Sequence, residues 1–195
     1  VIGNLTKDAI IRAAVSEGLT VSQVIGTSVV FEDGTSGISV LGEGSVYDTN
    51  AQKVVISYKD GGNSGYGTSV VGTVSGNSIS FGTPVVFNSG DTDYISAAYD
   101  SNAQKVVVVY TDYGDSTKGK AIVGTVSGTS ISFGTAVVYE SSSNNEWNTI
   151  VYDSNAQKVA VAYASSSTNG LCKVGTVSGT SISFGSSTTF NSGDT

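Results

Sequence analysis

The chain has 195 residues, of which 25 are glycine and one is proline, with 13% charged residues and a formal net charge of −7. This acidic balance excludes a nucleic-acid backbone or an anionic membrane as electrostatic partner, because both require a basic patch, and it favours a neutral or cationic partner. No apolar run reaches the roughly 18 residues needed to cross a bilayer.

Residues 1–33 are predicted to form a degenerate half-repeat of two strands. Residues 9–18 (AIIRAAVSEG) align with residues 121–128 (AIVGTVSG), which belong to a later repeat. A short amphipathic helix over residues 7–17, capped near Thr6, is the alternative. We favour strands, because the aligned residues are strand candidates further along the chain.

Three longer repeats of 51–53 residues follow. The motif YDxNAQKV begins at Tyr47, Tyr99 and Tyr152, and VGTVSG follows in step at Val71, Val123 and Val174. A fixed period near fifty residues is typical of architectures in which one unit cannot bury its own apolar surface and stacks on its neighbours. We place the repeats at residues 34–88, 89–139 and 140–191. Residues 192–195 are predicted to start a further repeat of a longer chain.

Each repeat offers four strand candidates, separated by clusters of Gly, Asp, Asn and Ser that suit turns. In the middle repeat the candidates are Tyr94–Tyr99, Lys105–Thr111, Lys120–Ser127 and Ser130–Tyr139. We refer to them as strands A, B, C and D. Strand B is continuously apolar (VVVVY), which is typical of a sheet covered on both faces.

Four-stranded antiparallel units of this length predict an all-β fold, namely a β-propeller-like array of about three and a half blades. Usual propellers have four to eight blades. Closure would therefore need more repeats or partner chains, and an open array is the alternative.

The repeated pattern YDxNAQKVVxxY, an Asp/Gly/Ser loop, AIVGTVSGTSISFGTxVVF and an NSGDT-like linker cover almost the whole chain. This pattern resembles the tandem propeller-like repeats of tail-fibre and other structural proteins of marine bacteriophages and, more loosely, the blades of propeller lectins. The resemblance implies a part of an exposed fibre or adhesin, located extracellularly or on a virion surface. It is weaker for function than for fold, because propellers include both enzymes and binding modules.

The connections between strands differ in how far they vary among the repeats. The A-to-B and C-to-D turns are nearly identical, whereas the B-to-C loops read KDGGNSGYGTS, TDYGDSTKGK and ASSSTNGL. The D-to-A loops vary as well. In a four-stranded antiparallel unit these two sets lie at opposite ends, so we expect one constant and one variable end. Binding residues usually lie on variable loops over a rigid frame.

The variable connections combine aromatic residues with carboxylates and amides, which is the chemistry that sugars require. We therefore expect a cell-surface glycan as ligand. The candidate ligand-binding residues are Asp60, Asn63, Tyr66, Asp91, Asp93, Tyr94, Asp112, Tyr113, Asp115, Glu146, Trp147 and Asn148.

Structural roles are the alternative for several repeated residues. Tyr94 and Trp147 occupy equivalent positions and could simply pack strand A against its neighbours. Tyr58, Tyr110 and Tyr163 recur at the end of strand B and are interpreted as core residues. Asp48, Asp100 and Asp153 are each followed two residues later by Asn, and we expect them to cap the A-to-B turn.

No metal site, cofactor or catalytic residue is predicted. The Asp-rich loops DGGNSG and DYGDST lack the spacing of an EF-hand. The sequence has no His and one Arg, Arg12, which excludes a Ser/His triad and an arginine cluster of the sialidase type. A pair of carboxylates could still hydrolyse a glycosidic bond.

We therefore expect a non-enzymatic repeat region of a fibre or adhesin, most simply a phage tail component, that recognises a cell-surface glycan. The first alternative is a purely structural virion or filament module that binds only sister subunits. The second is a fragment of a polysaccharide-degrading propeller enzyme.

Overall fold

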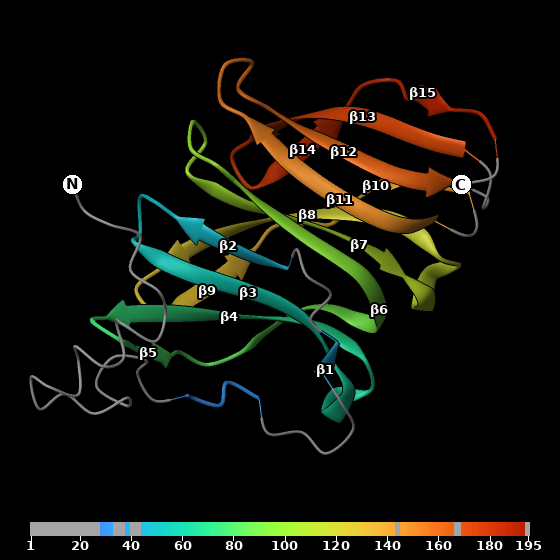
Figure 1. Cartoon of the computed structure of the whole chain (residues 1–195). Helices are drawn as coiled ribbons and strands as arrows, with labels where there is room; N and C mark the ends of the chain where they lie inside the picture. The colour runs from blue at the N-terminus through green and yellow to red at the C-terminus, as the bar shows by residue number, and fades with distance from the viewer. Residues whose placement is uncertain (1–27, 33–37, 40–43, 143–144, 166–168, 194–195) are drawn as a thin grey trace, which may run out of the picture.

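The computed structural model describes residues 28–32, 38–39, 44–142, 145–165 and 169–193 (Figure 1). The protein is all-β, as predicted, with antiparallel sheets, and neither sheet closes on itself within the described residues. The predicted half-repeat falls largely outside these residues. So do the choice between helix and strand over residues 7–17 and the end of the predicted further repeat.

Fifteen strands and two single-turn 3-10 helices make up the described fold. Their bounds are β1 Ile38–Ser39, β2 Ser45–Asp48, β3 Lys53–Asp60, η1 Gly61–Asn63, β4 Tyr66–Ser75, β5 Ser78–Phe81, β6 Val85–Asp100, β7 Lys105–Asp112, η2 Tyr113–Asp115, β8 Lys118–Ser127, β9 Ser130–Phe133, β10 Val137–Glu140, β11 Asn145–Asp153, β12 Lys158–Ser165, β13 Asn169–Ser178, β14 Ser181–Phe184 and β15 Thr188–Asn191. No helix of the described residues is long and apolar enough to span a membrane.

Hydrogen bonding joins β1–β10 into one sheet and β11–β15 into another. Within the larger sheet, β6 pairs with β4 up to Asp91 and with β7 from Thr92 onward. We therefore distinguish a first module (Ile38–Asp91), a second module (Thr92–Glu140) and a third module (Asn145–Asn191). In Figure 1 the first module is blue to green, and the third is orange to red.

Two strand boundaries differ from those predicted. The linker NSGDT, expected as a loop before strand A, is part of the sixteen-residue strand β6. Strand D, expected as one strand, is divided into β9 and β10. The division lets the next module approach closely, because a side chain at Gly134 would collide with the carbonyl group of Thr180, as one at Gly82 would with that of Thr129.

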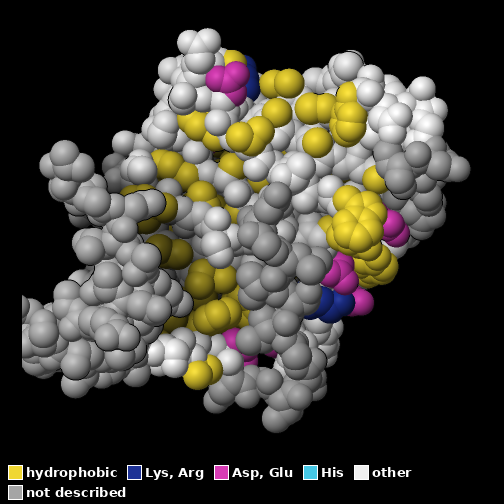
Figure 2. All heavy atoms as spheres, viewed as in Figure 1, with side chains coloured by type: hydrophobic (Ala, Val, Ile, Leu, Met, Phe, Trp, Pro, Cys, Tyr) yellow, Lys and Arg dark blue, Asp and Glu magenta, His cyan; other side chains and the backbone are white. Residues whose placement is uncertain are grey.

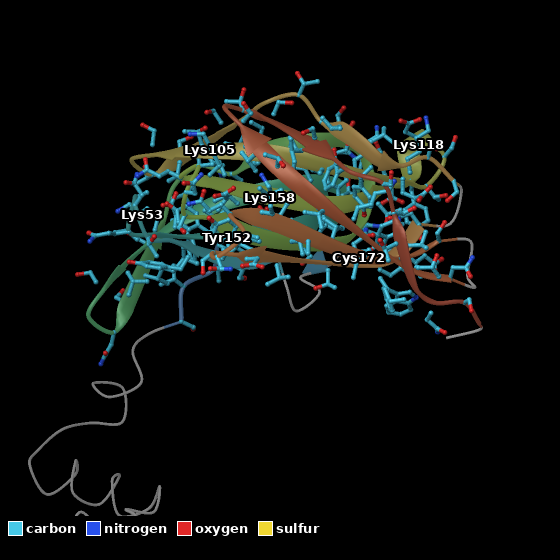
Figure 3. All side chains as sticks on the ribbon, turned by 90° about the horizontal axis from the view of Figure 1, so that it is seen from above. Lys53, Lys105, Lys118, Tyr152, Lys158 and Cys172 are labelled. Carbon is cyan, nitrogen blue, oxygen red and sulfur yellow. The ribbon has the colours of Figure 1, made fainter. Side chains whose placement is uncertain are left out.

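The constant and the variable connections lie at opposite ends of the modules, as predicted. Lys53, Lys105 and Lys158 each follow an A-to-B turn, and Figure 3 shows them toward the end opposite Lys118, which follows the B-to-C loop of the second module. The B-to-C loops of the first two modules contain η1 and η2.

The A-to-B turns are closed by their aspartates, which confirms the predicted capping role. Asp48 Oδ1 accepts hydrogen bonds from the backbone N–H groups of Asn50 (2.9 Å) and Ala51 (2.8 Å). Asp100 and Asp153 make the equivalent pairs of bonds in the second and third modules. This repeated turn fixes the register between strands A and B.

The hydrophobic cores lie between modules, so the modules stabilise one another. One cluster joins Val55, Val71 and Phe87 of the first module to Val106, Val108 and Tyr110 of the second, and the other joins Val107, Val109 and Val123 to Val159, Val161 and Tyr163 of the third. At roughly 1.5 to 3 kcal/mol for each buried side chain, an interface contributes on the order of 10 kcal/mol. The apolar strand β7 is covered on both faces, as predicted.

Four buried tyrosines predict a loss of stability in alkali. Tyr58, Tyr110, Tyr139 and Tyr163 are at most 3% exposed, and burial, reinforced by nearby carboxylates or tyrosines, raises the pKa of each hydroxyl above 10. The unfolded chain releases these protons near pH 10, whereas the folded chain retains them. The free energy of unfolding should therefore stay level below pH 10 and fall above it by about 1.4 kcal/mol per pH unit for each hydroxyl.

Urea unfolding between pH 8 and 11.5 measures this decline. The substitution Tyr163→Phe removes one titrating hydroxyl and should make the decline shallower. A free energy of unfolding that stays constant up to pH 11.5 would contradict the prediction.

Candidate functional site

Two aromatic residues lie on β-bulges at the variable end of strand A. The pairing between β6 and β7 shifts register between Asp93 and Ser96, and that between β11 and β12 shifts between Glu146 and Thr149. The bulged residues Tyr94 and Trp147 have positive φ angles of 48° and 56°. Bulky residues rarely adopt this left-handed conformation, which is costly and concentrates at functional sites.

The bulges place aromatic rings from neighbouring modules in contact. The ring centroids of Tyr94 and Trp147 are 5.2 Å apart, with their planes inclined by 55°. Trp147 is nevertheless 69% exposed, and Tyr113 on η2 is 41% exposed. We call Tyr94, Tyr113 and Trp147 the aromatic shelf. Figure 2 shows hydrophobic and acidic side chains side by side near the variable end.

A buried polar network supports the shelf from below. Asn148, 7% exposed, donates from Nδ2 to the Tyr94 carbonyl (3.2 Å) and to Thr111 Oγ1 (2.9 Å). Its Oδ1 accepts from the Tyr139 hydroxyl at 2.7 Å. Thr111 Oγ1 in turn donates to the Asn145 carbonyl at 2.8 Å. The network connects the second and third modules and fixes the backbone on both sides of the bulge.

Negative charge lies beside the shelf. Asp93 is 3.4 Å from Lys59 Nζ, which also binds Asp91 at 2.6 Å. Burial, followed by the negative charge of Glu146 and contact with Tyr113, raises the pKa of Tyr94 to about 12. The Tyr94 hydroxyl therefore stays protonated at neutral pH and can act as a hydrogen-bond donor.

A second group of charges holds the η2 loop in place. Lys120 Nζ lies 2.8 Å from both Asp112 and Asp115, and Lys118 Nζ lies 2.9 Å from Asp115. Hydrogen bonds from Lys120 and Lys118 lower the pKa of Asp115. Burial alone would lower the pKa of Lys120, but its hydrogen bonds to Asp112 and Asp115 raise it.

The structure brings together five of the predicted site residues and separates the others from them. Asp93, Tyr94, Tyr113, Glu146 and Trp147 lie at or beside the shelf. The other predicted residues have structural roles near the shelf or lie on the first module. Asp60 and Asp112 are buried and cap η1 and η2, Asp115 is ion-paired, Asn148 is buried in the network, and Asp91 pairs with Lys59. Asn63 is the last residue of η1, and Tyr66 is the first residue of β4, both on the first module.

Sequence reasoning missed the lysines and the strained backbone. Lys59 and Lys120 were not predicted as partners of the loop carboxylates, although a lysine in an otherwise apolar strand signals such pairing. The positive φ of Tyr94 had one indication, because the first repeat has Gly42 at the corresponding place in the sequence, and glycine favours this conformation.

An apolar groove of about 390 Å³ opens next to Trp147 on the third module. Its lining residues are Trp147, Thr149, Ala162, Tyr163, Ala164, Gly170 and Phe190. Among the described residues, no group of three or more Cys, Asp or Glu side chains is arranged to hold a metal ion.

No family model and no curated protein matches the chain. The chemistry of the shelf is therefore the basis for a functional proposal.

Proposed function

We propose that this chain is a non-enzymatic repeat region of an exposed fibre or adhesin, of the kind found in phage tails, and that it binds a cell-surface glycan. Its modules would act as propeller-like blades, with strand A innermost. The single observation that carries the proposal is the exposed Trp147, which packs against Tyr94 on a strained bulge beside carboxylates.

The shelf has the groups that a sugar ring requires. The exposed face of Trp147 can stack on the C–H groups of a pyranose, while Glu146 and Asp93 accept hydrogen bonds from its hydroxyls. The hydroxyls of Tyr94 and Tyr113, which contact each other, together supply a donor. Because the formal charge of the chain is −7, a neutral or cationic sugar suits this surface better than an anionic one.

The ion pairs at the variable end favour a role in sugar binding over a role in catalysis. A glycosidase needs one carboxyl whose pKa is raised so that it can donate a proton. At the variable end, by contrast, Asp112 and Asp115 are paired with Lys120, and Asp91 and Asp93 with Lys59. The lowered pKa of Asp115 keeps this carboxylate charged.

A glycan array tests the proposal. We expect the wild-type chain to bind a defined set of neutral or amino sugars and Trp147→Ala to weaken that binding at least about tenfold, the equivalent of about 1.4 kcal/mol. Trp147→Phe should retain part of the affinity because it keeps a ring face. Val86→Ala, which shortens an exposed side chain of the first module, is the control and should bind normally.

Other outcomes distinguish the alternatives. Circular dichroism shows whether Trp147→Ala retains the fold. Unchanged binding by a folded Trp147→Ala would contradict the proposed site. Absence of binding by every intact assembly would favour a purely structural module, and turnover of a capsular polysaccharide would favour an enzyme fragment.

A further inference from the structure

Among the described residues, nothing covers the outward face of the third module as the third module covers that of the second. In the second module Ala98, Val123 and Tyr139 are at most 6% exposed, because the third module packs on them. The equivalent residues of the third module, Val151, Val174 and Phe190, are 62%, 52% and 66% exposed. Figure 2 shows hydrophobic side chains over the β11–β13 sheet and a second group over β2 and β3 of the first module.

The inner modules show what covers this face. Phe87 packs on Tyr110 and Phe133 of the next module, with centroid distances of 5.1 and 5.6 Å. Tyr139 packs on Tyr163 (5.2 Å) and Phe184 (5.6 Å) in the same way. Phe190 is the equivalent aromatic residue of the third module. The surface that fits it therefore presents a tyrosine from strand B and a phenylalanine from strand D.

The constant end repeats this complementarity through hydrogen bonds. The Tyr99 hydroxyl accepts from the Asn50 N–H of the preceding module, and the Tyr152 hydroxyl accepts from the Asn102 N–H, both at 3.3 Å. Tyr47 of the first module is 51% exposed. The last turn, which begins at Asp153, is also exposed, whereas Asp48 and Asp100 are 2% exposed. The first module thus exposes the tyrosine, and the third module exposes the turn, of a contact that is complete between the inner modules.

Within the chain, Phe31 covers the matching aromatic pair of the first module. Its ring lies 5.3 Å from that of Tyr58 and 5.5 Å from that of Phe81. Residues 28–32 belong to no strand among the described residues, whereas Phe87 and Tyr139 lie in paired strands. Phe31 therefore occupies the same position as those residues without the backbone pairing that holds them.

We propose that a second copy of this chain docks head to tail, with its first module on the outward face of the third module. Phe190 then replaces Phe31 on Tyr58 and Phe81 of the partner copy, and the partner's Tyr47 hydroxyl accepts from the Asn155 N–H. Such a contact joins different surfaces, so it closes into a ring or continues as a filament. The apolar B strands, Val54 and Ile56 on one side and Ala160 and Ala162 on the other, become buried between the copies.

Sedimentation equilibrium of the whole chain across a range of concentrations tests the docking. The wild type should self-associate, and Phe190→Ala should weaken association at least about tenfold while remaining folded, because Phe190 is 66% exposed. Phe31→Ala should strengthen association, because it removes the competitor. Val138→Ala, an exposed valine of the second module, is the control and should associate like the wild type.

Alkylation of Cys172 gives an independent measurement. This sole cysteine is partly exposed on β13, in the outward face of the third module (Figure 3), so its reaction with iodoacetamide should slow as the protein concentration rises. The proposal is overturned if Phe190→Ala associates like the wild type, if Phe31→Ala associates more weakly, or if both the wild type and Phe31→Ala remain monomeric. Glycan binding plays no part in either measurement.

Discussion

Replacing Asn148 with leucine is expected to lower the free energy of unfolding by about 3 kcal/mol. The Asn148 side chain accepts from the Tyr139 hydroxyl and donates to Thr111 Oγ1 and the Tyr94 carbonyl. Leucine would remove the side-chain donor to the Tyr94 carbonyl and would leave the Tyr139 hydroxyl and Thr111 Oγ1 with Asn145 alone. Each buried group left unsatisfied costs about 1 to 3 kcal/mol. Because the network supports the bulge, the proposed glycan binding at Trp147 should weaken as well.

Urea unfolding monitored by circular dichroism measures the effect. Asn155→Leu makes the same substitution at an exposed position and should change the free energy of unfolding by no more than about 0.5 kcal/mol. If Asn148→Leu costs less than about 1 kcal/mol, the network does not hold the second and third modules together as described.

Replacing Lys120 with methionine is expected to destabilise the protein by about 3 to 5 kcal/mol. The side chains of Lys120 and Asp112 are 16% and 6% exposed and lie 2.8 Å apart. Methionine fills a similar volume but leaves the carboxylate of Asp112 buried without its cation. The η2 loop, which presents Tyr113 to the shelf, should loosen with it.

Two further variants separate the buried pair from its exposed neighbour. Lys118→Met removes only the more exposed pair with Asp115 and should cost at most about 1 kcal/mol. The double variant Lys120→Met/Asp112→Asn should recover part of the lost stability, because no charge is then buried alone. Equal destabilisation by Lys118→Met and Lys120→Met would contradict the assignment.

The architecture could be predicted from the sequence because the same turn and strand motifs occur three times in the chain. The turns that start at Asp48, Asp100 and Asp153 have one composition and one geometry, and the continuously apolar strand β7 required cover on both faces. The segregation of constant and variable connections followed from strand direction alone. Whether the modules form propeller-like blades remains part of the functional proposal.

The composition of the candidate site was less predictable, because its residues meet across modules. Tyr94 and Trp147 lie far apart in the sequence, and their contact depends on how two sheets pack. The pairing of Lys59 with Asp91 and Asp93 likewise joins β3 to the middle of β6, two strands that β4 separates in the sheet. Asp60 and Asp112 looked like ligand groups by composition, but local hydrogen bonds bury them as helix caps.

The hydrogen bond from an A-to-B turn to a tyrosine of the next module allows the gene to gain or lose whole repeats. Tyr99 and Tyr152 make the same bond to near-identical turns, so unequal crossing-over between those segments would add or delete one whole module. The turn contacts and the aromatic contacts between neighbouring modules would then recur in the new array. Lineages can thus lengthen or shorten the protein in steps of one repeat without redesigning the turn contact.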